Sequence, residues 1–565
     1  MCSSAAMLGK VTMRTFRARV RRCCGTLRPM SEQPFAGPQP RGRKLTGFNA
    51  ATWRTAANDP TMRSPVVGLM LLEESPNVDQ LGRRLEQLSR QFPVLRQRLV
   101  QPAFVFNSPR LVVDPYFDVT LHVSRVRASK PGTWDQVLRM ARRHSLNDLD
   151  RDRALWRAVL VEDLEGGQAA VIVVLHHAIA DGQGMVMLMA SLVDWSAEPP
   201  PAAPLPAAPA PGVVDPVSVT VTALRSGGKR VAEQGLETVG KIPGAAVAVL
   251  RHPRTSVKTT VGSVGSLSRV AAVHREPLSP VMRERSTTYT ARTMDIPFAA
   301  LKAAGKSRGH SINDTFMAAL TGGMRIYHEN HGRVPPTLRV NVPISIRTEA
   351  DDASTNAVSI ARMELKVDVA DPLLRMQDAS TKVGGARREP AHQMINDLAE
   401  LQRFAPAFVL GRIAQTSDFT ASNVPGPPVP VWLGGAKVKR LYPLVPTVGA
   451  AVNITLLSYS GVWASIGVSM DDAAVPDPDA MMSALAEGFA EVGAGPADGA
   501  SDPVSGGSPV AAGSATQATT TKAPATRAPA KKAPAKKAPA KKAPAKKVPA
   551  KRAPAKKAAP KEPPD

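Results

Sequence analysis

The sequence predicts an α/β protein with two similar folded units, a long connection between them and a basic, disordered tail. Segments with strand and helix periodicity alternate on both sides of a proline-rich stretch at residues 196–212. The chain has 565 residues, too many for one small domain, and its hydrophobic content of 43% can fill two cores. Beyond about residue 496 the chain becomes rich in Ala, Pro and Lys, a composition that does not form a core.

These changes in composition divide the chain into five expected parts. Residues 1–44 form a basic extension that is disordered, a surface-binding leader, or a start assigned too early, with Met30 as the alternative start. The other parts are a first α/β unit (45–195), a proline-rich linker and crossover (196–292), a second α/β unit (293–495) and a disordered tail (496–565).

In the first unit, hydrophobic periodicity predicts alternating strands and helices. Before residue 130 we expect a strand at 66–72, a helix at 78–95 with Pro93 near its end, and two strands around a turn at 111–123. After that point we expect a helix at 133–146, a hairpin at 156–177 that turns at Gly166-Gly167, and a helix at 184–195.

The second unit has the same alternation. A helix is predicted at 311–330, with Ser311 or Asn313 as its N-cap. Strands are predicted at 336–347, 355–367, 450–461 and 462–471, where apolar residues alternate or run together.

The excess of positive charge is concentrated in the tail. The whole chain carries a net charge of +25, and residues 522–565 hold 15 Lys and Arg against 2 Asp and Glu, a net charge of +13. The folded body is therefore only moderately basic.

The positions of the cysteines and the lengths of the apolar stretches exclude several classes of protein. The three cysteines lie at positions 2, 23 and 24, so the body cannot use a disulfide scaffold, a thiolate metal site or a cysteine nucleophile. No apolar stretch approaches the roughly 18 residues that span a bilayer. A protein of the reducing cytoplasm fits this pattern.

The segment VIVVLHHAIADGQG, residues 171–184, carries the clearest chemical signal. An apolar run ends in His176-His177, and Asp181-Gly182 follow three residues later. A buried strand that ends in an imidazole can present a lone general base, which takes a proton from a hydroxyl group as that hydroxyl attacks an activated acyl group. No G-x-S-x-G nucleophile elbow is present, so a covalent serine intermediate is not expected.

Structural interpretations of the same residues remain open. His177 would be a satisfied core histidine if the motif stood alone. Asp181 is either a relay carboxylate or, as we prefer, a turn-holding group paired with an arginine, for which Arg347 and Arg325 are candidates. Gly182 permits a backbone conformation closed to other residues.

Further segments in the same order as the motif reveal a family resemblance. Before the motif stand FPVLRQRL, VVDPYFDVTLHV and LDRDRALW, and after it stand SINDTFMAAL, VPISIR, SNVPGP and LLSYSG. Over most of residues 45–495 the chain resembles the bacterial wax ester synthase/acyl-CoA:diacylglycerol acyltransferase family of the CoA-dependent acyltransferase superfamily. The family usually has Pro-Leu-Trp where this chain has Ala154-Leu155-Trp156, which puts the acceptor preference in doubt.

The resemblance implies two chloramphenicol-acetyltransferase-like domains whose interface forms a tunnel for acyl-CoA and a lipid alcohol. His177 would be the general base at its centre, and His176 would shape the site. Asn313 resembles the second-half active-site residue and would donate to the developing oxyanion, although a helix N-cap explains it equally well. Acyl-CoA would be a co-substrate, and no cofactor or metal is expected.

Two tempting motifs are incomplete. Gly305-Lys306-Ser307 resembles the end of a P-loop, but position 300 is alanine where the first glycine should stand. His328 and His331 are one residue too close for the HExxH zinc motif.

The tail repeats KKAPA from Lys531, and its prolines prevent helix formation. Such a polycation binds polyanions in a salt-sensitive way, so an anionic membrane, a lipid-droplet surface or nucleic acid is an expected partner of residues 522–561. A solvated tail without a defined partner is the simpler alternative.

The sequence thus predicts an acyl-CoA-dependent O-acyltransferase that makes triacylglycerol from diacylglycerol, with long-chain alcohols as a second acceptor that gives wax esters. It would be a cytoplasmic protein, peripheral on the inner membrane or on lipid droplets. The alternatives are a condensation-type acyltransferase that uses a carrier protein, and a polycation-tailed protein that tethers lipid droplets to DNA.

Overall fold

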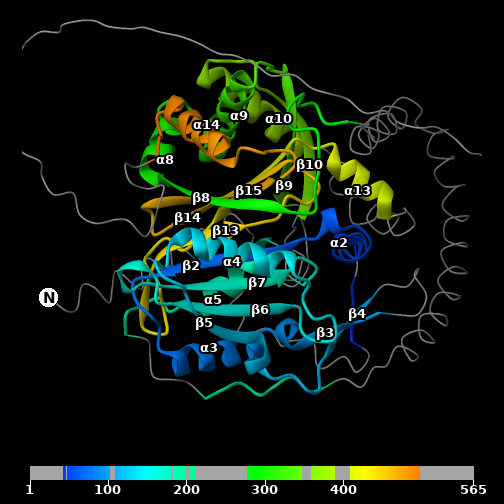
Figure 1. Ribbon diagram of the computed structural model, residues 1–565, viewed down its shortest axis with the longest axis vertical. Helices are drawn as coiled ribbons and strands as arrows, with labels where there is room; N and C mark the ends of the chain where they lie inside the picture. The colour runs from blue at the N-terminus through cyan, green and yellow to red at the C-terminus, as the bar shows by residue number, and fades with distance from the viewer. Residues whose placement is uncertain are drawn as a thin grey trace, which may run out of the picture. The chain divides into compact units, whose positions relative to one another are not determined.

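Two α/β halves make up the ordered body of the protein (Figure 1). The computed structural model describes residues 42–45, 47–101, 109–179, 182–198, 204–211, 276–345, 358–388 and 407–496. Both halves belong to one compact unit.

The first half follows the predicted alternation of strands and helices. Its strands are β1 (Arg43–Lys44), β2 (Pro65–Leu72), β3 (Gln97–Val100), β4 (Arg110–Val113), β5 (Val123–Arg127), β6 (Trp156–Glu162) and β7 (Ala169–His176). Its α-helices are α2 (Gly47–Asn58), α3 (Val78–Gln91), α4 (Trp134–Leu146) and α5 (Gly182–Leu192). Short 3-10 turns stand at η1 (Pro60–Met62), η2 (Pro93–Arg96), η3 (Val119–His122) and η4 (Glu165–Gly167).

Local chemistry sets the ends of these elements. The side chain of Asn77 caps α3 by accepting from the Gln80 N–H at 3.0 Å, and the helix ends at Gln91 because Pro93 disfavours helical geometry in Phe92. The predicted hairpin of β6 and β7 turns at Gly166 and Gly167, whose φ angles of 72° and 74° favour glycine.

The first half also begins earlier than expected. Residues 43 and 44, placed by the sequence in the N-terminal extension, form β1 and pair with β4 beside Leu111 and Arg110. Residues 1–41 lie outside the described part of the chain.

The second half consists of a sheet and the helices that cover it. Its strands are β8 (Tyr289–Pro297), β9 (Thr337–Ser345), β10 (Val358–Lys366), β11 (Phe419–Pro425), β12 (Trp432–Leu433), β13 (Ala436–Leu444), β14 (Val452–Tyr459) and β15 (Trp463–Asp471). Its helices are α8 (Phe298–Lys306), α9 (Ile312–Asn330), α10 (Pro372–Arg387), α13 (Ala407–Gln415) and α14 (Pro478–Glu491). Figure 1 shows α8, α9, α10 and α14 on the side of this sheet that faces away from the first half.

The second half contributes strands β12 and β13 to the six-stranded sheet of the first half. One sheet has the order β10-β9-β11-β14-β15-β8, and the other has the order β12-β13-β2-β7-β6-β5. Residues 436–444, which the sequence assigns to the second unit, therefore pair antiparallel with β2 of the first. Periodicity identifies a strand but not its partner, so this pairing was not predicted.

A buried carboxylate ties strand β13 to the second sheet. Asp295 of β8 is 1% exposed and accepts from Arg440 Nε at 2.9 Å, from the Tyr442 hydroxyl at 2.7 Å and from the Ser465 hydroxyl at 2.7 Å. Burial and the carboxylate of Asp295 raise the pKa of Tyr442 well above its usual value, so the phenol stays a proton donor. This network fixes the position of one half against the other.

Several predicted segments lie partly or wholly outside the described residues. The described part of the linker, residues 204–211, has no regular structure, and Arg90 of α3 donates to the Pro206 carbonyl at 3.0 Å. Most of the predicted crossover and the tail from residue 497 onward are not described. Within the described ranges, no helix is long and apolar enough to cross a membrane.

Candidate active site

The end of β7 presents the two histidines between two neighbouring chain segments. Val171 to Leu175 are buried, as expected for a strand covered on both faces. The His176 N–H donates to the Leu155 carbonyl at 3.0 Å, and the His177 N–H donates to the Ser64 carbonyl at 3.2 Å. The backbone of both histidines is thereby held where β2 and β6 begin.

The ring of His176 acts within the turn that follows β7. Its Nδ1 accepts from the Ala178 N–H at 3.0 Å, so the neutral ring carries its proton on Nε2. The ring packs 5.1 Å from the Trp53 indole of α2. Desolvation by burial, then the charges of His177 and Arg151, lower the pKa of His176 to about 3. The ring is therefore neutral at physiological pH and accepts a hydrogen bond within the turn.

This low pKa makes stability depend on pH. Between pH 6.5 and pH 3 the unfolded chain binds a proton at position 176 that the folded protein excludes, so stability falls as the pH falls through that window. From pH 7 to pH 5 we expect His176 to cost about 2 kcal/mol of unfolding free energy. Urea unfolding of the native protein and of His176→Asn, which keeps an acceptor, should show a smaller loss in the variant. Equal losses in both proteins would contradict the assignment.

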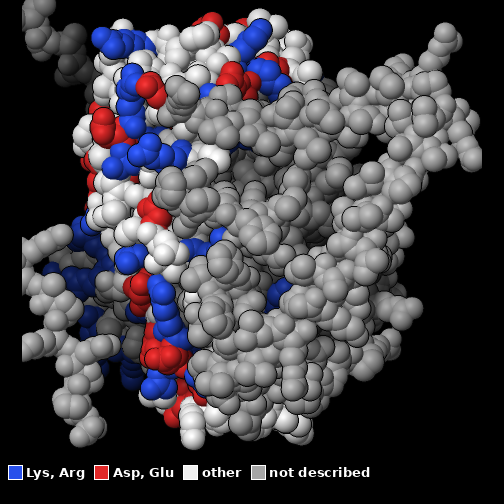
Figure 2. Space-filling model, turned by 90° about the vertical axis from the view of Figure 1, so that its right-hand side faces the viewer, with Lys and Arg blue, Asp and Glu red and all other residues white. Residues whose placement is uncertain are grey.

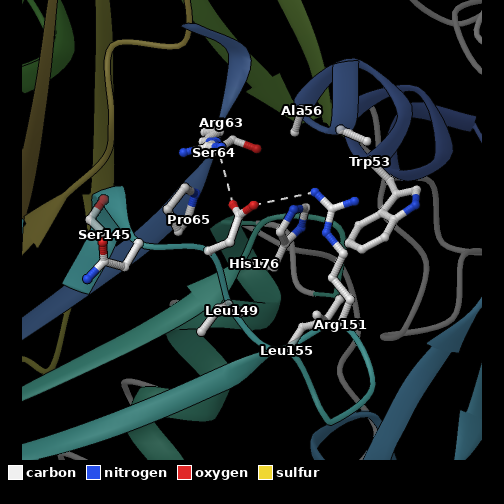
Figure 3. A pocket seen from close by; sticks show the side chains of 13 residues that line it. Trp53, Ala56, Arg63, Ser64, Pro65, Ser145, Leu149, Arg151, Leu155 and His176 are labelled. Carbon is white, nitrogen blue, oxygen red and sulfur yellow. Dashed lines mark ion pairs between the residues drawn. The ribbon is translucent and has the colours of Figure 1, made fainter. Parts of the chain in front are cut away.

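A small pocket opens beside His176 (Figure 3). It encloses about 410 Å³, part of it open to solvent, between α2, the start of β2 and the segment that follows α4. Asp148 pairs with both Arg63 and Arg151 at 3.5 Å, and the Arg151 guanidinium lies 5.1 Å from the Trp53 ring centre. The side chains of Trp53, Arg63, Asp148 and Arg151 were not predicted as site residues, although Arg151 lies in the quoted segment LDRDRALW.

The structure describes only some of the other predicted site residues and their candidate partners. His177 is half-buried and follows β7 directly, and Gly182 begins α5. Asp181 and one candidate partner, Arg347, lie outside the described residues. The other candidate, Arg325, forms ion pairs with Glu329 at 2.6 Å and with Glu491, so its charge is neutralised within the second half.

Asn313 lies in the first turn of α9 and is not the cap of that helix. Ser311 is the N-cap: its hydroxyl accepts from the Asp314 N–H at 3.2 Å, and Asp314 accepts from the Ser311 N–H at 3.0 Å. The structural interpretation of Asn313 as an N-cap is therefore wrong. α9 packs against α8, α10 and α14 in the second half, whereas His176 ends β7 in the sheet of the first half.

Three predicted segments meet at Trp156, the first residue of β6. Its indole N–H donates to the Leu95 carbonyl of FPVLRQRL at 2.8 Å. The His122 ring of VVDPYFDVTLHV stacks on it at 4.7 Å, and Phe117 stacks on His122 at 5.2 Å. These three segments of the chain thus pack together next to β7.

In the second half, SNVPGP and LLSYSG run side by side. They end the parallel strands β11 and β14, where Pro425 pairs with Ser458 and the Ser460 N–H donates to the Pro427 carbonyl at 2.7 Å. Residues 422–425 therefore belong to strand β11, and β11 contacts α5, the helix that follows the histidine motif.

The incomplete motifs have structural roles. A side chain at Gly305 would meet the Thr315 hydroxyl at 2.4 Å, so this glycine allows α8 and α9 to approach. His328 is buried, donates from Nδ1 to the Met324 carbonyl at 2.7 Å and lies 2.8 Å from the Ser279 hydroxyl. Within the described ranges, no three His, Cys, Asp or Glu side chains are grouped as metal ligands require.

Solved structures define the class of fold. A wax ester synthase/diacylglycerol acyltransferase from Marinobacter aquaeolei VT8 has a TM-score of 0.53 at 19% identity, over 79% of this chain and 98% of that one. The starter condensation domain of rhizomide synthetase, in complex with C8-CoA and Leu-SNAC, has a TM-score of 0.51 at 13% identity over 83% and 97%. The fold is thus the two-domain α/β fold of the condensation and CoA-dependent acyltransferases, as the sequence predicted.

Sequence comparisons define the family within that class. The family model described as "Wax ester synthase/diacylglycerol acyltransferase catalytic domain" matches residues 45–316, and "WS/DGAT C-terminal domain" matches residues 354–493. Two Mycobacterium tuberculosis H37Rv proteins named "Putative diacyglycerol O-acyltransferase" are 36% identical over 77% of this chain and 88% of the relative, and 28% identical over 66% and 80%. The chain belongs to the wax ester synthase/diacylglycerol acyltransferase family and is an acyltransferase.

Proposed function

We propose that this protein transfers the acyl group of a long-chain acyl-CoA to the free hydroxyl of diacylglycerol, and that long-chain alcohols are a second acceptor. The products are triacylglycerol and wax ester. The observation that carries the proposal is His177, placed by a buried strand at the start of HHxxxDG in a chain of this family. The names of the M. tuberculosis relatives support the same acceptor.

The proposed reaction needs one base and no covalent enzyme intermediate. His177 removes the proton of the acceptor hydroxyl as its oxygen attacks the thioester carbonyl. The tetrahedral intermediate then expels the CoA thiolate, which takes the proton back from His177. One ester bond forms, one thioester bond breaks, and the histidine returns to its initial state.

The other motif residues would support this base. His176 holds the turn through the Ala178 N–H. Asp181 and Gly182 are proposed to set the chain direction after the turn, and Asn313 is proposed to donate to the oxyanion because its amide is not used by the helix cap.

We also propose a lipid surface as the place of reaction, because both acceptor and product are insoluble in water. On the face shown in Figure 2, acidic and basic side chains of the described residues are intermixed. The net charge of +13 that is concentrated in residues 522–565 would attract anionic lipid, with nucleic acid as the competing polyanion.

The test is acceptor-dependent release of CoA. Purified protein is given palmitoyl-CoA with diacylglycerol or with a long-chain alcohol in detergent, and the products are identified by mass spectrometry. We expect triacylglycerol in the first case, wax ester in the second, and no release without an acceptor. A chain that lacks residues 522–565 should keep this turnover in detergent and lose activity on anionic vesicles.

The negative outcomes point to different conclusions. If folded protein releases no CoA with either acceptor, the neutral-lipid assignment is wrong. Activity with an acyl group on a carrier protein would then indicate a condensation-type enzyme. Inactivity with every donor would favour a tethering protein.

A further inference from the structure

The turn that carries His177 is closed by two hydrogen bonds of His176. The Ile179 N–H donates to the His176 carbonyl at 3.0 Å, and the Ala178 N–H donates to His176 Nδ1 at 3.0 Å. Because the second bond is made by a side chain, the turn keeps its shape only while the imidazole ring of His176 stays in one orientation. His177 lies inside this turn, so the orientation of the His176 ring sets the direction in which the proposed base points.

Trp53 of α2 packs against the His176 ring (Figure 3). The two ring centres are 5.1 Å apart and the ring planes are tilted by 58°, an arrangement that aromatic pairs favour. The indole is itself held in place. It is buried, its Nε1–H donates to Gln101 Oε1 at 3.2 Å, and the Arg151 guanidinium lies 5.1 Å from its ring centre. A rigid indole with these further contacts can fix the orientation of the His176 ring.

A second support of the turn comes from the same segment of the chain. Residues 53–64 run from α2 through η1 to the start of β2, and the Ser64 carbonyl accepts from the His177 N–H. This segment also contacts the second half, because α13 packs against α2 and Gln415 Nε2 donates to the Thr61 hydroxyl at 3.2 Å. The segment that supports both histidines is therefore itself supported by both halves of the protein.

We propose that Trp53 is a positioning residue for acyl transfer, which holds the His176 ring and so keeps the turn that points His177 at the acceptor hydroxyl. This inference rests on the role proposed above for His177. The indole N–H is used by Gln101, so Trp53 acts through His176 and not on the reacting atoms. A reacting group that is misplaced by about 1 Å can slow a reaction about a hundredfold, so loss of this contact should be visible in kcat.

The kinetic test replaces Trp53 with methionine, a flexible apolar side chain that fills much of the space but has no flat ring. We expect Trp53→Met to lower kcat with palmitoyl-CoA and diacylglycerol by about 10- to 100-fold and to leave KM unchanged. Trp53→Phe restores an aromatic face against His176 and should recover most of the loss. A native kcat in folded Trp53→Met would overturn the proposal.

Trp134→Met is the matched control, because it removes a second buried indole from the same core. Trp134 donates from Nε1 to the Thr293 hydroxyl at 2.9 Å, and its ring packs 5.4 Å from that of Tyr442. It begins α4, whereas the opposite end of that helix, at Ser145, lines the pocket beside His176. We expect Trp134→Met to lose stability as Trp53→Met does and to keep the native kcat. An equal loss of kcat in both variants would show that the role of Trp53 is only structural.

A double-mutant cycle tests whether Trp53 acts through His176. An asparagine at position 176 keeps an acceptor for the Ala178 N–H on a short side chain, which has no ring for the indole to hold. In a His176→Asn protein, Trp53→Met should therefore lower kcat by less than about threefold. The full loss in that background would contradict the proposal, because Trp53 would then act by another route.

A measurement on the ring itself does not depend on turnover. In protein labelled with 15N-histidine, native His176 should show one neutral tautomer with its proton on Nε2, because Nδ1 is an acceptor. The signals of two tautomers should be averaged in Trp53→Met, and the native pattern should remain in Trp134→Met. An averaged tautomer in the native protein would refute the proposal even if Trp53→Met does not fold.

The spectra also separate this inference from the proposed function. If the native protein transfers no acyl group, but the His176 tautomer changes in Trp53→Met and not in Trp134→Met, the positioning contact is supported and the acyltransferase proposal is wrong. If the native protein transfers the acyl group and the His176 tautomer is the same in folded Trp53→Met, the proposed function stands and the positioning role is wrong.

Discussion

Replacing His177 with alanine is expected to lower acceptor-dependent CoA release by about 10²- to 10⁴-fold, the usual contribution of a general base. The reason is that no other base is predicted for the acceptor hydroxyl. The His177 N–H donates to the Ser64 carbonyl, and this bond fixes position 177 at the end of β7. The loss should appear in kcat, because alanine removes the base and leaves the rest of the site in place. Steady-state kinetics with palmitoyl-CoA and diacylglycerol measure it.

Two controls separate this effect from general damage. His331→Ala removes a histidine at the end of α9, in the outer helix layer of the second half, and should leave the rate unchanged. His176→Asn keeps an acceptor for the Ala178 N–H and should retain most of the activity. A folded His177→Ala protein with native turnover would show that the base lies elsewhere.

Replacing Gly467 with alanine is expected to separate the two halves. Gly467 lies in β15 where strand β13 crosses, and an added Cβ would stand 1.8 Å from the Pro443 carbonyl oxygen. Neither backbone can yield easily, because β13 is paired with β2 and Asp295 binds Arg440. We expect a loss of about 3 kcal/mol or more in the free energy of unfolding.

The matched control is Gly385→Ala. Gly385 lies in α10, and an added Cβ would meet nothing within 4 Å, so alanine should stabilise the helix by roughly 0.5–1 kcal/mol. Denaturant unfolding of both variants gives the comparison. A Gly467→Ala protein as stable as the native chain would mean that β13 and β15 are not in close contact in solution.

The local structure was largely predictable because it depends on short-range patterns. The strand before His176, the helix that begins after Ser311 and the turn at Gly166-Gly167 all follow from the spacing of apolar residues and from capping or glycine chemistry. Two of the segments that carry the family resemblance, FPVLRQRL and LDRDRALW, meet in the structure at Trp156.

The sequence by itself determined the fold class, the family and the position of the histidine motif. Only the tertiary structure decided which sheet β13 joins, that Trp53 packs against His176, and that Asp295 lies under Arg440 and Tyr442. These contacts join residues far apart in the chain, and periodicity describes one segment at a time without naming its partner. The site depends on such partners, because a base acts only where distant segments hold it against its substrate.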